Sequence, residues 1–459
     1  MRSDPGCGIT ASSDPIRGVE QGEFMIFHSF EQVQNHLDHL GLFHMDFGLD
    51  RMRRALRALA LSETPYPVVH IVGTNGKGST STFLASLATA HGLKTGLYTS
   101  PHFLTPRERI RINGAMLSPK RWTALASRVH EAAPDLTYFE FLTAAGLLAF
   151  AEEHVDLAVL EAGLGGRYDA TTAAPAQVLC YTPIAMDHEN VLGHTIGAIA
   201  SDKAGAIRPM PNGSFVLTGP QPREALDCLA RAAEESGVPF VAVEPRALPF
   251  GLLELSDPAS IPRLGLAGPH QITNSRLALA AWEFLCAERG WRLTREATLK
   301  GLADARLAGR FQFIPADAGL PPIILDGAHN PHGLNALAAA LEEARIRPRA
   351  VIFSCLADKN RQEMLPLIRR IAGNSPVFTP TIQDNERAMS GEVLAEELGS
   401  NAVPAQRLRL ALDAAAMTKP ADAEQPVVLC GSLYLLGEFF TLYPNRLEES
   451  VPASPQIDR

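Results

Sequence analysis

Residues 68–80, Val-Val-His-Ile-Val-Gly-Thr-Asn-Gly-Lys-Gly-Ser-Thr, join an apolar segment to a glycine-rich turn that carries one lysine. The three glycines Gly73, Gly76 and Gly78 permit main-chain angles that other residues avoid, so peptide N–H groups can converge on phosphate oxygens. Lys77 would add a positive charge for the β- and γ-phosphates of a nucleotide. The stretch therefore predicts a strand that ends in a phosphate-binding loop.

The residues after the loop predict a helix. Residues 78–91 have apolar side chains at helical spacing, and Gly92 follows where a left-handed C-terminal cap is expected. The N-terminus of this helix would then point at the phosphates. An ordinary strand-to-helix turn with a solvated Lys77 is the alternative interpretation.

The composition is that of a globular enzyme of two or three domains. The 459 residues include 46% hydrophobic and 20% charged residues, with a formal net charge of -9. This charge provides no basic field for nucleic acid or an anionic membrane. No apolar run approaches the length of about 20 residues that spans a membrane, and residues 1–24 lack the pattern of a secretory signal. We therefore expect a cytoplasmic protein with neither nucleic-acid nor membrane partners. The six cysteines form no C-x-x-C pair, so reduced thiols are expected rather than zinc or disulfides.

Short apolar runs alternate with helix-like segments along the chain. The runs are residues 68–72, 157–161, 177–183, 239–243, 322–326, 350–354 and 427–430. This alternation predicts an α/β protein with parallel sheets, in which ligands bind beyond the carboxyl ends of the strands. We expect a P-loop ATPase-type N-terminal domain with a mostly parallel sheet, and a smaller Rossmann-like C-terminal domain. The expected ranges are 1–24 for a flexible extension, 25–304 for the first domain, 305–320 for a linker, 321–445 for the second domain and 446–459 for a flexible tail.

Polar residues follow several of these runs. Glu161 ends a buried strand, and a buried carboxylate needs a partner, for which a magnesium ion or Arg167 is a candidate. Asp187 and His188 follow another run, and Lys203 lies further on, near an expected helix start. Taken alone, His188 and Lys203 are as compatible with structural or solvated roles as with a metal site.

The loop Gly-Thr-Asn-Gly-Lys-Gly-Ser at residues 73–79 resembles that of the Mur ligase superfamily, and the additional Gly78 resembles its folylpolyglutamate synthase and dihydrofolate synthase branch. Ile71 stands where the general P-loop pattern has its first glycine. Further motifs resemble this branch in the same order, over about residues 27 to 440. They are Ser-Pro-His at 100–102 in an Ω loop, Glu-Ala-Gly-Leu-Gly-Gly-Arg at 161–167, Asp-His at 187–188, Lys-Ala-Gly at 203–205, His-Gln-Ile-Thr-Asn at 270–274, Gly-Arg-Phe at 309–311 and Leu-Asp-Gly-Ala-His-Asn-Pro at 325–331.

The resemblance implies ATP-dependent formation of an amide through an acyl phosphate. Its implied ATP-binding residues are Gly73, Thr74, Asn75, Gly76, Lys77, Gly78, Ser79 and Thr80 of the loop, with Asn274 at the adenine, Arg310 reaching the nucleotide and Asp326 at the ribose. Ser100 and Glu161 would bind one magnesium ion, and His188 and a carbamylated Lys203 a second. The implied catalytic residues are Lys77, Lys203, His188 and His329, and a monovalent cation is a further candidate cofactor.

Two segments resemble the pterin-binding parts of bifunctional bacterial members. Residues 44–51 resemble their N-terminal dihydropteroate loop, and Tyr-Phe-Glu at 138–140 lies near the pterin in the family, which implies Asp46, Gly48 and Phe139 as pterin-binding residues. The implied substrates are dihydropteroate, reduced folates and L-glutamate, and a monomer is expected. A cell-wall peptide ligase and a non-catalytic ATP-binding protein are the rival interpretations. The residues do not decide between the dihydropteroate step, the polyglutamate step and both.

Overall fold

The strand β1 (Val68–Val72) lies at the centre of an eight-stranded sheet, buried along its whole length. The computed structural model describes residues 26–41, 48–208, 210–243, 263–317, 319–418 and 425–447. The strand order is β4-β3-β2-β5-β1-β6-β7-β8, in which β3 pairs antiparallel with both β2 and β4, and the other neighbouring strands pair in parallel. The remaining strands of this sheet are β2 (Thr95–Tyr98), β3 (Ile110–Ile112), β4 (Ala115–Met116), β5 (Leu157–Glu161), β6 (Val178–Tyr181), β7 (Phe215–Thr218) and β8 (Phe240–Ala242).

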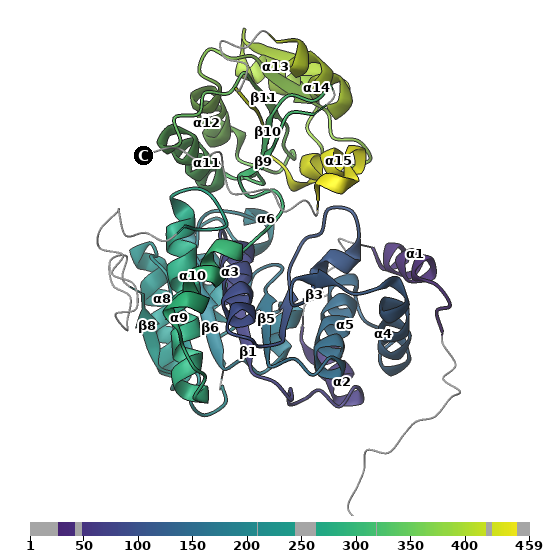
Figure 1. The fold of residues 1–459 in the computed structure, drawn as a ribbon, viewed down its shortest axis with the longest axis vertical. Coiled ribbons are helices and arrows are strands. Elements are labelled where there is room, and N and C mark those ends of the chain that lie inside the picture. The colour runs from purple at the N-terminus through teal and green to yellow at the C-terminus, as the bar shows by residue number, and fades with distance from the viewer. Residues whose placement is uncertain are drawn as a thin grey trace, which may run out of the picture.

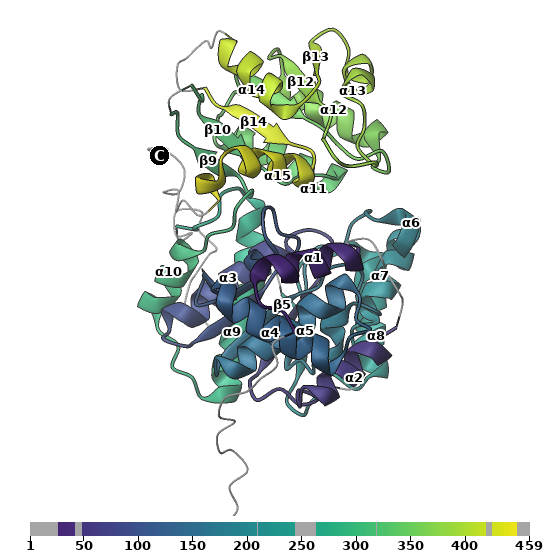
Figure 2. The ribbon, with the colours of Figure 1, turned by 90° about the vertical axis from the view of Figure 1, so that its right-hand side faces the viewer.

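Alternate residues of β1 face two layers of helices, because side chains of a strand point to opposite faces. Val69 and Ile71 pack in the core of one layer, whereas Val68 and Val72 pack in the cores of the other. The first layer contains α3 (Lys77–Ala90), α9 (His270–Arg289) and α10 (Arg295–Asp304). The second contains α1 (Phe30–Leu40), α2 (Asp50–Ala58), α4 (Pro119–Ala132), α5 (Tyr138–Glu152), α7 (Ile196–Ala204) and α8 (Arg223–Glu235). Figure 2 shows α1, α4 and α5 in front of this sheet.

A second sheet of six strands forms the core of a separate C-terminal domain (Figure 1). Its strands are, in spatial order, β13 (Ala402–Ala405), β12 (Val377–Pro380), β11 (Ala350–Phe353), β14 (Val427–Cys430), β10 (Ile323–Leu325) and the antiparallel β9 (Gln312–Ile314). One face is covered by α11 (Pro331–Glu343), α12 (Arg361–Ala372) and α13 (Gly391–Leu398), and the other by α14 (Leu408–Met417) and α15 (Leu433–Leu442). Short helices are α6 (Glu189–Leu192), η1 (Pro106–Arg109), η2 (Ala170–Ala173) and η4 (Pro444–Arg446).

The expected α/β class, with a mostly parallel first sheet and a smaller second domain, is confirmed. All seven apolar runs contain strands. The strand β9 lies within the range expected as linker, and Arg446 at the start of the expected tail pairs with Asp317. The prediction for residues 1–24 lies outside the described residues, as do 448–459 of the tail.

The strand β2 was not expected, because Gly96 interrupts its apolar pattern. The structure explains this glycine, since a Cβ atom there would lie 2.4 Å from the ring of Phe150 on α5. Close approach of a helix, rather than a turn, requires glycine at this position. The strands β7, β12 and β13 were also missed.

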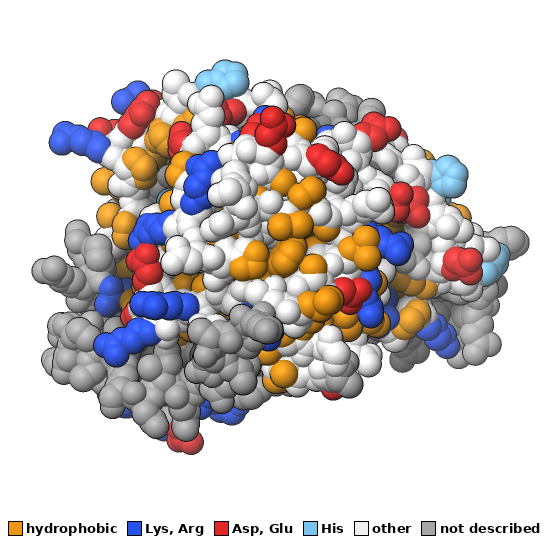
Figure 3. All heavy atoms as spheres, turned by 90° about the horizontal axis from the view of Figure 1, so that it is seen from above, with side chains coloured by type: hydrophobic (Ala, Val, Ile, Leu, Met, Phe, Trp, Pro, Cys, Tyr) orange, Lys and Arg blue, Asp and Glu red, His pale blue; other side chains and the backbone are white. Residues whose placement is uncertain are grey.

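The described residues carry surface charges of both signs and free cysteines. Figure 3 shows basic and acidic side chains interspersed on the outer face of the C-terminal domain. Within the described ranges, no helix has the length and apolarity to cross a membrane. Cys180, Cys228, Cys286, Cys355 and Cys430 are free thiols, and Cys7 lies outside the described residues.

Glu283 on α9 is a buried acid that makes no hydrogen bond with the described residues. Its exposed fraction is 2%, and burial raises the pKa of its carboxyl from 4.5 to about 7. A raised carboxyl pKa means that the unfolded chain releases this proton more easily, so stability is lost as the pH rises from 4.5 through about 7.

We expect Glu283→Gln to raise the free energy of unfolding by about 1–3 kcal/mol at pH 8 and to change it little at pH 4. Urea unfolding of both proteins at several pH values measures this difference. The exposed Glu234→Gln on α8 is the control. An equal effect of Glu283→Gln at pH 4 and pH 8 would contradict the assignment.

Candidate active site

The loop after β1 is held open by glycines in conformations that other residues avoid. Gly73 and Gly76 have φ angles of 149° and 89°, and a Cβ atom on them would lie 2.0 Å from Thr182 Oγ1 and 2.3 Å from Asn274 Oδ1. Gly76 is the N-cap of α3 and provides no side-chain hydrogen bond. The N–H groups of the first turn of α3 are thus without a side-chain cap and available to an anion.

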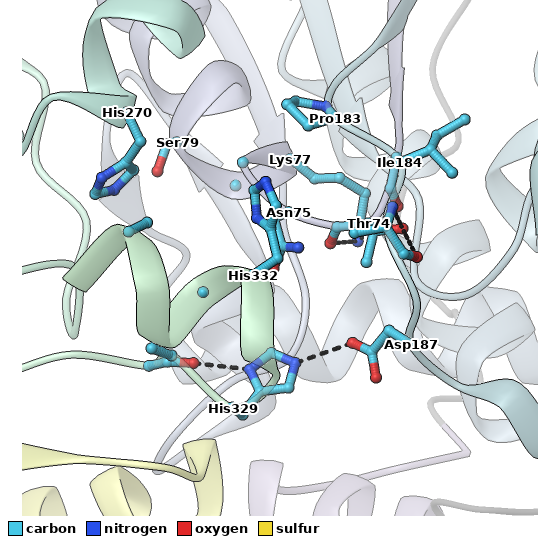
Figure 4. Close-up of a pocket in the computed structure, with 18 of the residues that line it drawn as sticks. Thr74, Asn75, Lys77, Ser79, Pro183, Ile184, Asp187, His270, His329 and His332 are labelled. Carbon is cyan, nitrogen blue, oxygen red and sulfur yellow. Dashed lines mark hydrogen bonds and ion pairs between the residues drawn. The ribbon is translucent and has the colours of Figure 1, made fainter. Parts of the chain in front are cut away.

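Two amide groups of the loop are already engaged. Thr74 N and Asn75 N donate to the carbonyl of Pro183 at 3.1 and 3.3 Å, and Thr74 Oγ1 donates to the carbonyl of Ala185 at 3.1 Å. These bonds tie the loop to the segment after β6 (Figure 4). The N–H groups from Gly76 onward are therefore better placed for phosphate than those of Thr74 and Asn75.

Two lysines converge on one carbonyl of the loop. Lys77 Nζ donates to the carbonyls of Gly73 and Thr74, both at 3.2 Å, and Lys203 Nζ donates to that of Gly73 at 2.8 Å. Lys203 is 3% exposed, and burial together with the charge of Lys77 lowers its pKa to about 7. The alternative interpretation of Lys203 as a solvated lysine is therefore wrong, because its side chain is buried.

The placement of Lys203 near a helix start was wrong. Helix α7 begins after its N-cap Thr195, whose side chain accepts from Ala198 N, and ends at Ala204. Lys203 is thus in the last turn. The cap at Thr195 was overlooked because Gly193 and Gly197 flank it and weaken the helical pattern.

Glu161 and Ser100 meet beside the loop. Glu161 Oε2 accepts from Ser100 N at 3.0 Å, and its carboxylate would lie 3.3 Å from a Cβ atom on Gly78. Burial raises the pKa of Glu161, while Lys77 and the Ser100 N–H oppose the shift. Arg167 instead donates to the carbonyl of Ser201, so the described contacts do not support the pairing of Glu161 with Arg167.

Asp187 joins the two domains. Its Oδ1 accepts from Lys359 Nζ at 2.6 Å, and its Oδ2 lies 3.0 Å from Asn330 Nδ2 and 3.4 Å from His329 Nε2. Burial favours the neutral acid, but His329, Lys359 and His188 hold the pKa of Asp187 well below its usual range. Figure 4 shows His329 reaching Asp187 from the C-terminal domain.

His188 adopts a left-handed conformation, with φ of 51°, as the N-cap of α6. Its Nε2 is 4.0 Å from Asp187 Oδ2, and its side chain is 43% exposed. Burial of the remainder lowers the pKa of His188 to about 4, an effect that Asp187 opposes. The ring is therefore neutral near pH 7 and able to bind a metal ion.

A cavity of about 610 Å³ brings most of the predicted residues together. Its lining includes Gly73 to Ser79, Ser100, Glu161, His188, Lys203, Asn274, Arg310, Asp326 and His329. Thr80 is fully buried and does not belong to the lining. Both oxygens of Asp326 accept main-chain N–H groups, from Phe311 at 2.9 Å and Ala328 at 2.8 Å. Each oxygen keeps a second lone pair for a ligand hydroxyl.

A second cavity, of about 1110 Å³, adjoins the first. Ser100, Asp187, His188 and His329 line both. Phe139 lines the second, where its ring faces Gly163 so closely that a Cβ atom there would be 2.6 Å away. Gly48, with φ of 135°, lines neither cavity, and Asp46 lies outside the described residues.

Comparison with known proteins shows the family of this chain. Residues 309–433 match the Mur ligase, glutamate ligase domain. The dihydrofolate synthase/folylpolyglutamate synthase of Bacillus subtilis is 34% identical over 368 residues, which cover 76% of this chain and 84% of that protein. The chain belongs to the dihydrofolate synthase/folylpolyglutamate synthase family. It is thus a ligase of the Mur superfamily, and the resemblance noted from the motifs is confirmed.

Solved structures of relatives hold nucleotides. Escherichia coli FolC in complex with DHPP and ADP has a TM-score of 0.78 and 29% identity, covering 91% of this chain and 98% of that one. The bifunctional synthase of Yersinia pestis, complexed with AMPPNP and a Mn ion, has a TM-score of 0.76 and 29% identity over the same shares. The two-domain architecture of this ligase is therefore that of nucleotide-binding relatives.

Several residues of the site were not predicted. Lys359 and Asn330 reach Asp187 from the other domain, and Asn330 Nδ2 also donates to Asn75 Oδ1 at 3.1 Å. Arg109, in the Ω loop, lines the second cavity. Asn330 lies in a quoted motif and could have been found there, whereas Lys359 carries no local signal.

Proposed function

We propose that this ligase uses ATP to join L-glutamate both to dihydropteroate and to reduced folates. The observation that supports the proposal is that the two cavities adjoin. The phosphate-binding loop lines the smaller cavity and Phe139 lines the larger cavity, while Ser100, His188 and His329 line both. An acceptor in the larger cavity could thus present its carboxylate to a nucleotide in the smaller. Phosphoryl transfer depends largely on such positioning.

The reaction would proceed in two balanced steps. A carboxylate oxygen of the acceptor attacks the γ-phosphorus of ATP, the bond to the β–γ bridging oxygen breaks, and ADP leaves. The amino nitrogen of L-glutamate then attacks the acyl carbon, the carbon–oxygen bond to phosphate breaks, and phosphate leaves as the amine releases its proton. Closure of the two domains would protect the acyl phosphate from water.

His329 is the candidate for taking up that proton. Its Nδ1 lies 2.7 Å from the carbonyl of Gly327, which can only accept, so this nitrogen carries a hydrogen and Nε2 is the basic atom. Asp187 Oδ2, 3.4 Å from Nε2, would stabilise the imidazolium that forms.

We propose that the nucleotide is held by the loop residues from Gly73 to Ser79 and by residues that line the same cavity. Asn274 lies against Gly76, and Arg310 lies against Gly327, where a Cβ atom would be 2.2 Å from its Nη1. Asp326 would accept from a ribose hydroxyl. The role of Thr80 stays a prediction.

The residues beside the loop fit one magnesium ion. Glu161 is a buried carboxylate without a salt bridge to any described residue, and Ser100 supplies a second oxygen donor beside it. Mg²⁺ prefers such oxygens and takes its remaining ligands from phosphates and water. When bound, the ion would neutralise charge on the transferred phosphoryl group. The Mn ion with AMPPNP in the Yersinia pestis relative supports a divalent cation here.

A second ion at His188 and Lys203 requires a change in Lys203. The described residues contain no group of three or more His, Cys, Asp and Glu side chains suited to a metal ion. An unmodified amine donates to Gly73 and adds no anionic ligand. Carbamylation of Lys203 would supply a carboxylate-like donor, so we propose this modification with the second ion. A monovalent cation stays a prediction.

Purified enzyme with ATP and L-glutamate tests the proposal directly. We expect ADP release with dihydropteroate and with tetrahydrofolate, products heavier by one glutamyl residue in mass spectrometry, and no release with a muramyl nucleotide. Release with the muramyl nucleotide alone would favour the cell-wall ligase. No release with any acceptor would favour a non-catalytic ATP-binding protein.

Gly48→Ala is expected to impair the dihydropteroate reaction at least about fivefold more than glutamate addition to tetrahydrofolate. Alanine rarely adopts the φ angle of 135° found at Gly48. No described atom lies within 4 Å of the added Cβ, so the substitution would act by disfavouring this main-chain angle and not by a steric clash. Comparing kcat/KM for the two acceptors measures it. Gly237→Ala, at another open positive-φ position, is the control. Equal losses with both acceptors would make the loop merely structural.

A further inference from the structure

Arg109 is a buried cation without a carboxylate partner. It ends η1 in the Ω loop, lines the larger cavity and is 3% exposed. Among the described residues, no Asp or Glu oxygen lies within 4.0 Å of its guanidinium, although other arginines of the chain form such pairs. Withdrawing a charged group from water without a counter-charge is costly.

The adjacent acid does not fill this role. Glu108 accepts from the main-chain N–H groups of Phe103, Leu104 and Thr105 at 2.7 to 3.0 Å, as part of a capping box with Thr105. Its carboxylate thus holds the Ω loop in shape. Arg109 is consequently left as a fixed positive charge.

Neutral groups hold Arg109 in one orientation. Its Nε donates to His102 Nδ1 at 2.9 Å, and its Cζ lies 5.7 Å from the ring centre of Tyr138 and 6.0 Å from that of Phe139. The Tyr98 hydroxyl is a further neutral neighbour. A guanidinium has five N–H donors in a planar fork, so these contacts leave donors for a ligand.

The Ω loop that carries Arg109 begins at the boundary between the two cavities. Ser100, at the start of the loop, lines both cavities and donates to Glu161. Phe103 packs against Phe440 of the C-terminal domain, with ring centres 4.9 Å apart. The loop is therefore anchored to both domains. An anion that binds Arg109 would therefore lie in the larger cavity, beside Phe139, on the loop whose Ser100 reaches the nucleotide cavity.

We propose that Arg109, positioned by His102 and by the rings of Tyr138 and Phe139, binds the carboxylate of the acceptor substrate. This is the carboxylate that ATP activates, so the inference rests on the proposed function. The planar guanidinium would donate one hydrogen bond to each carboxylate oxygen, in the bidentate geometry that is common for arginine–carboxylate pairs. Arg109 is thereby a binding residue that aims the reacting oxygen toward the nucleotide cavity.

A thermodynamic cycle between Arg109 and the ligand carboxylate tests this role. Dissociation constants of dihydropteroate and of its carboxamide would be measured by titration of the nucleotide-free enzyme. We expect the wild-type protein to bind the acid at least about tenfold more tightly than the amide. Arg109→Met should bind both equally, with little change in affinity for the amide. Arg107→Met is the matched control, since Arg107 donates to the carbonyl of Leu117 and lies outside both cavity linings, and it should keep the preference.

The outcomes separate this inference from the proposed function. If the wild-type protein binds neither dihydropteroate nor tetrahydrofolate, the proposed function fails. If it binds dihydropteroate but prefers the acid as strongly after Arg109→Met, or does not prefer it at all, only the assignment of Arg109 is overturned. If Arg109→Met does not fold, a crystal structure of the wild-type complex with dihydropteroate decides: a carboxylate within hydrogen-bonding distance of the guanidinium supports the assignment, and one elsewhere overturns it.

Discussion

Replacing Lys77 with alanine is expected to lower kcat/KM for ligation by about 10²–10³-fold while the protein stays folded. The ammonium group lies beside the loop carbonyls of Gly73 and Thr74, at the base of α3, where nucleotide phosphates would bind. Removing it takes a positive charge from the phosphoryl group during transfer, and losses of this size follow when one such group is deleted from an active site. Initial rates of ADP release at varied ATP measure the effect.

The control for Lys77→Ala is Lys94→Ala, a lysine paired with Glu153 on the surface of the same domain. It should leave the rate unchanged, since exposed ion pairs contribute little. Both variants should show the circular dichroism of the wild-type protein. If Lys77→Ala retains more than a tenth of the wild-type rate, the loop is not the phosphate site that we propose.

The residues of the nucleotide cavity could be predicted because their signals are local. The glycines of residues 73–78 are required by the turn itself, and Glu161 ends a run that is apolar along its length. Such patterns are visible in a single stretch of chain. The same is true of Asp326, which caps a buried strand and accepts main-chain N–H groups only two and fifteen residues away.

The contacts between domains could not be predicted in this way. Asp187 and Lys359 are separated by 172 residues, and nothing in the neighbourhood of either shows that they meet at 2.6 Å. The local sequence around Arg109 is that of an ordinary polar loop, and only the folded structure shows that its side chain is buried. The short strands β12 and β13 also lack a clear strand pattern in the sequence. In β13 the reason is that it is a partly exposed edge strand containing Pro404. Tertiary packing, rather than local pattern, determines these features.

Lys203 is expected to carry a carbamate that the enzyme needs for activity. The amine is buried, its pKa is lowered to about 7, and its neighbours include the loop that would hold the phosphates. Carbon dioxide reacts with a neutral amine: the nitrogen forms a bond to carbon, and a proton is released. Since an amine is neutral above its pKa, the neutral form of Lys203 predominates above about pH 7, well below the range in which an ordinary lysine loses its proton. This lysine is thereby prepared for the reaction in a way that a solvated lysine is not.

Two measurements follow for Lys203. Enzyme depleted of carbon dioxide should regain activity when carbon dioxide is restored. At equal concentrations of dissolved carbon dioxide, recovery should be faster at pH 8 than at pH 6, because the neutral amine is more abundant at the higher pH. Lys203→Ala should lower kcat by about 10²–10³-fold, and acetate should restore part of the rate by supplying the missing carboxylate. The control Lys94→Ala keeps Lys203, so it should respond to carbon dioxide as the wild-type enzyme does and should gain nothing from acetate. A crystal structure of the magnesium–nucleotide complex with an unmodified Lys203 still bonded to Gly73 would contradict the carbamate, and it would leave His188 without the anionic partner that a second ion requires.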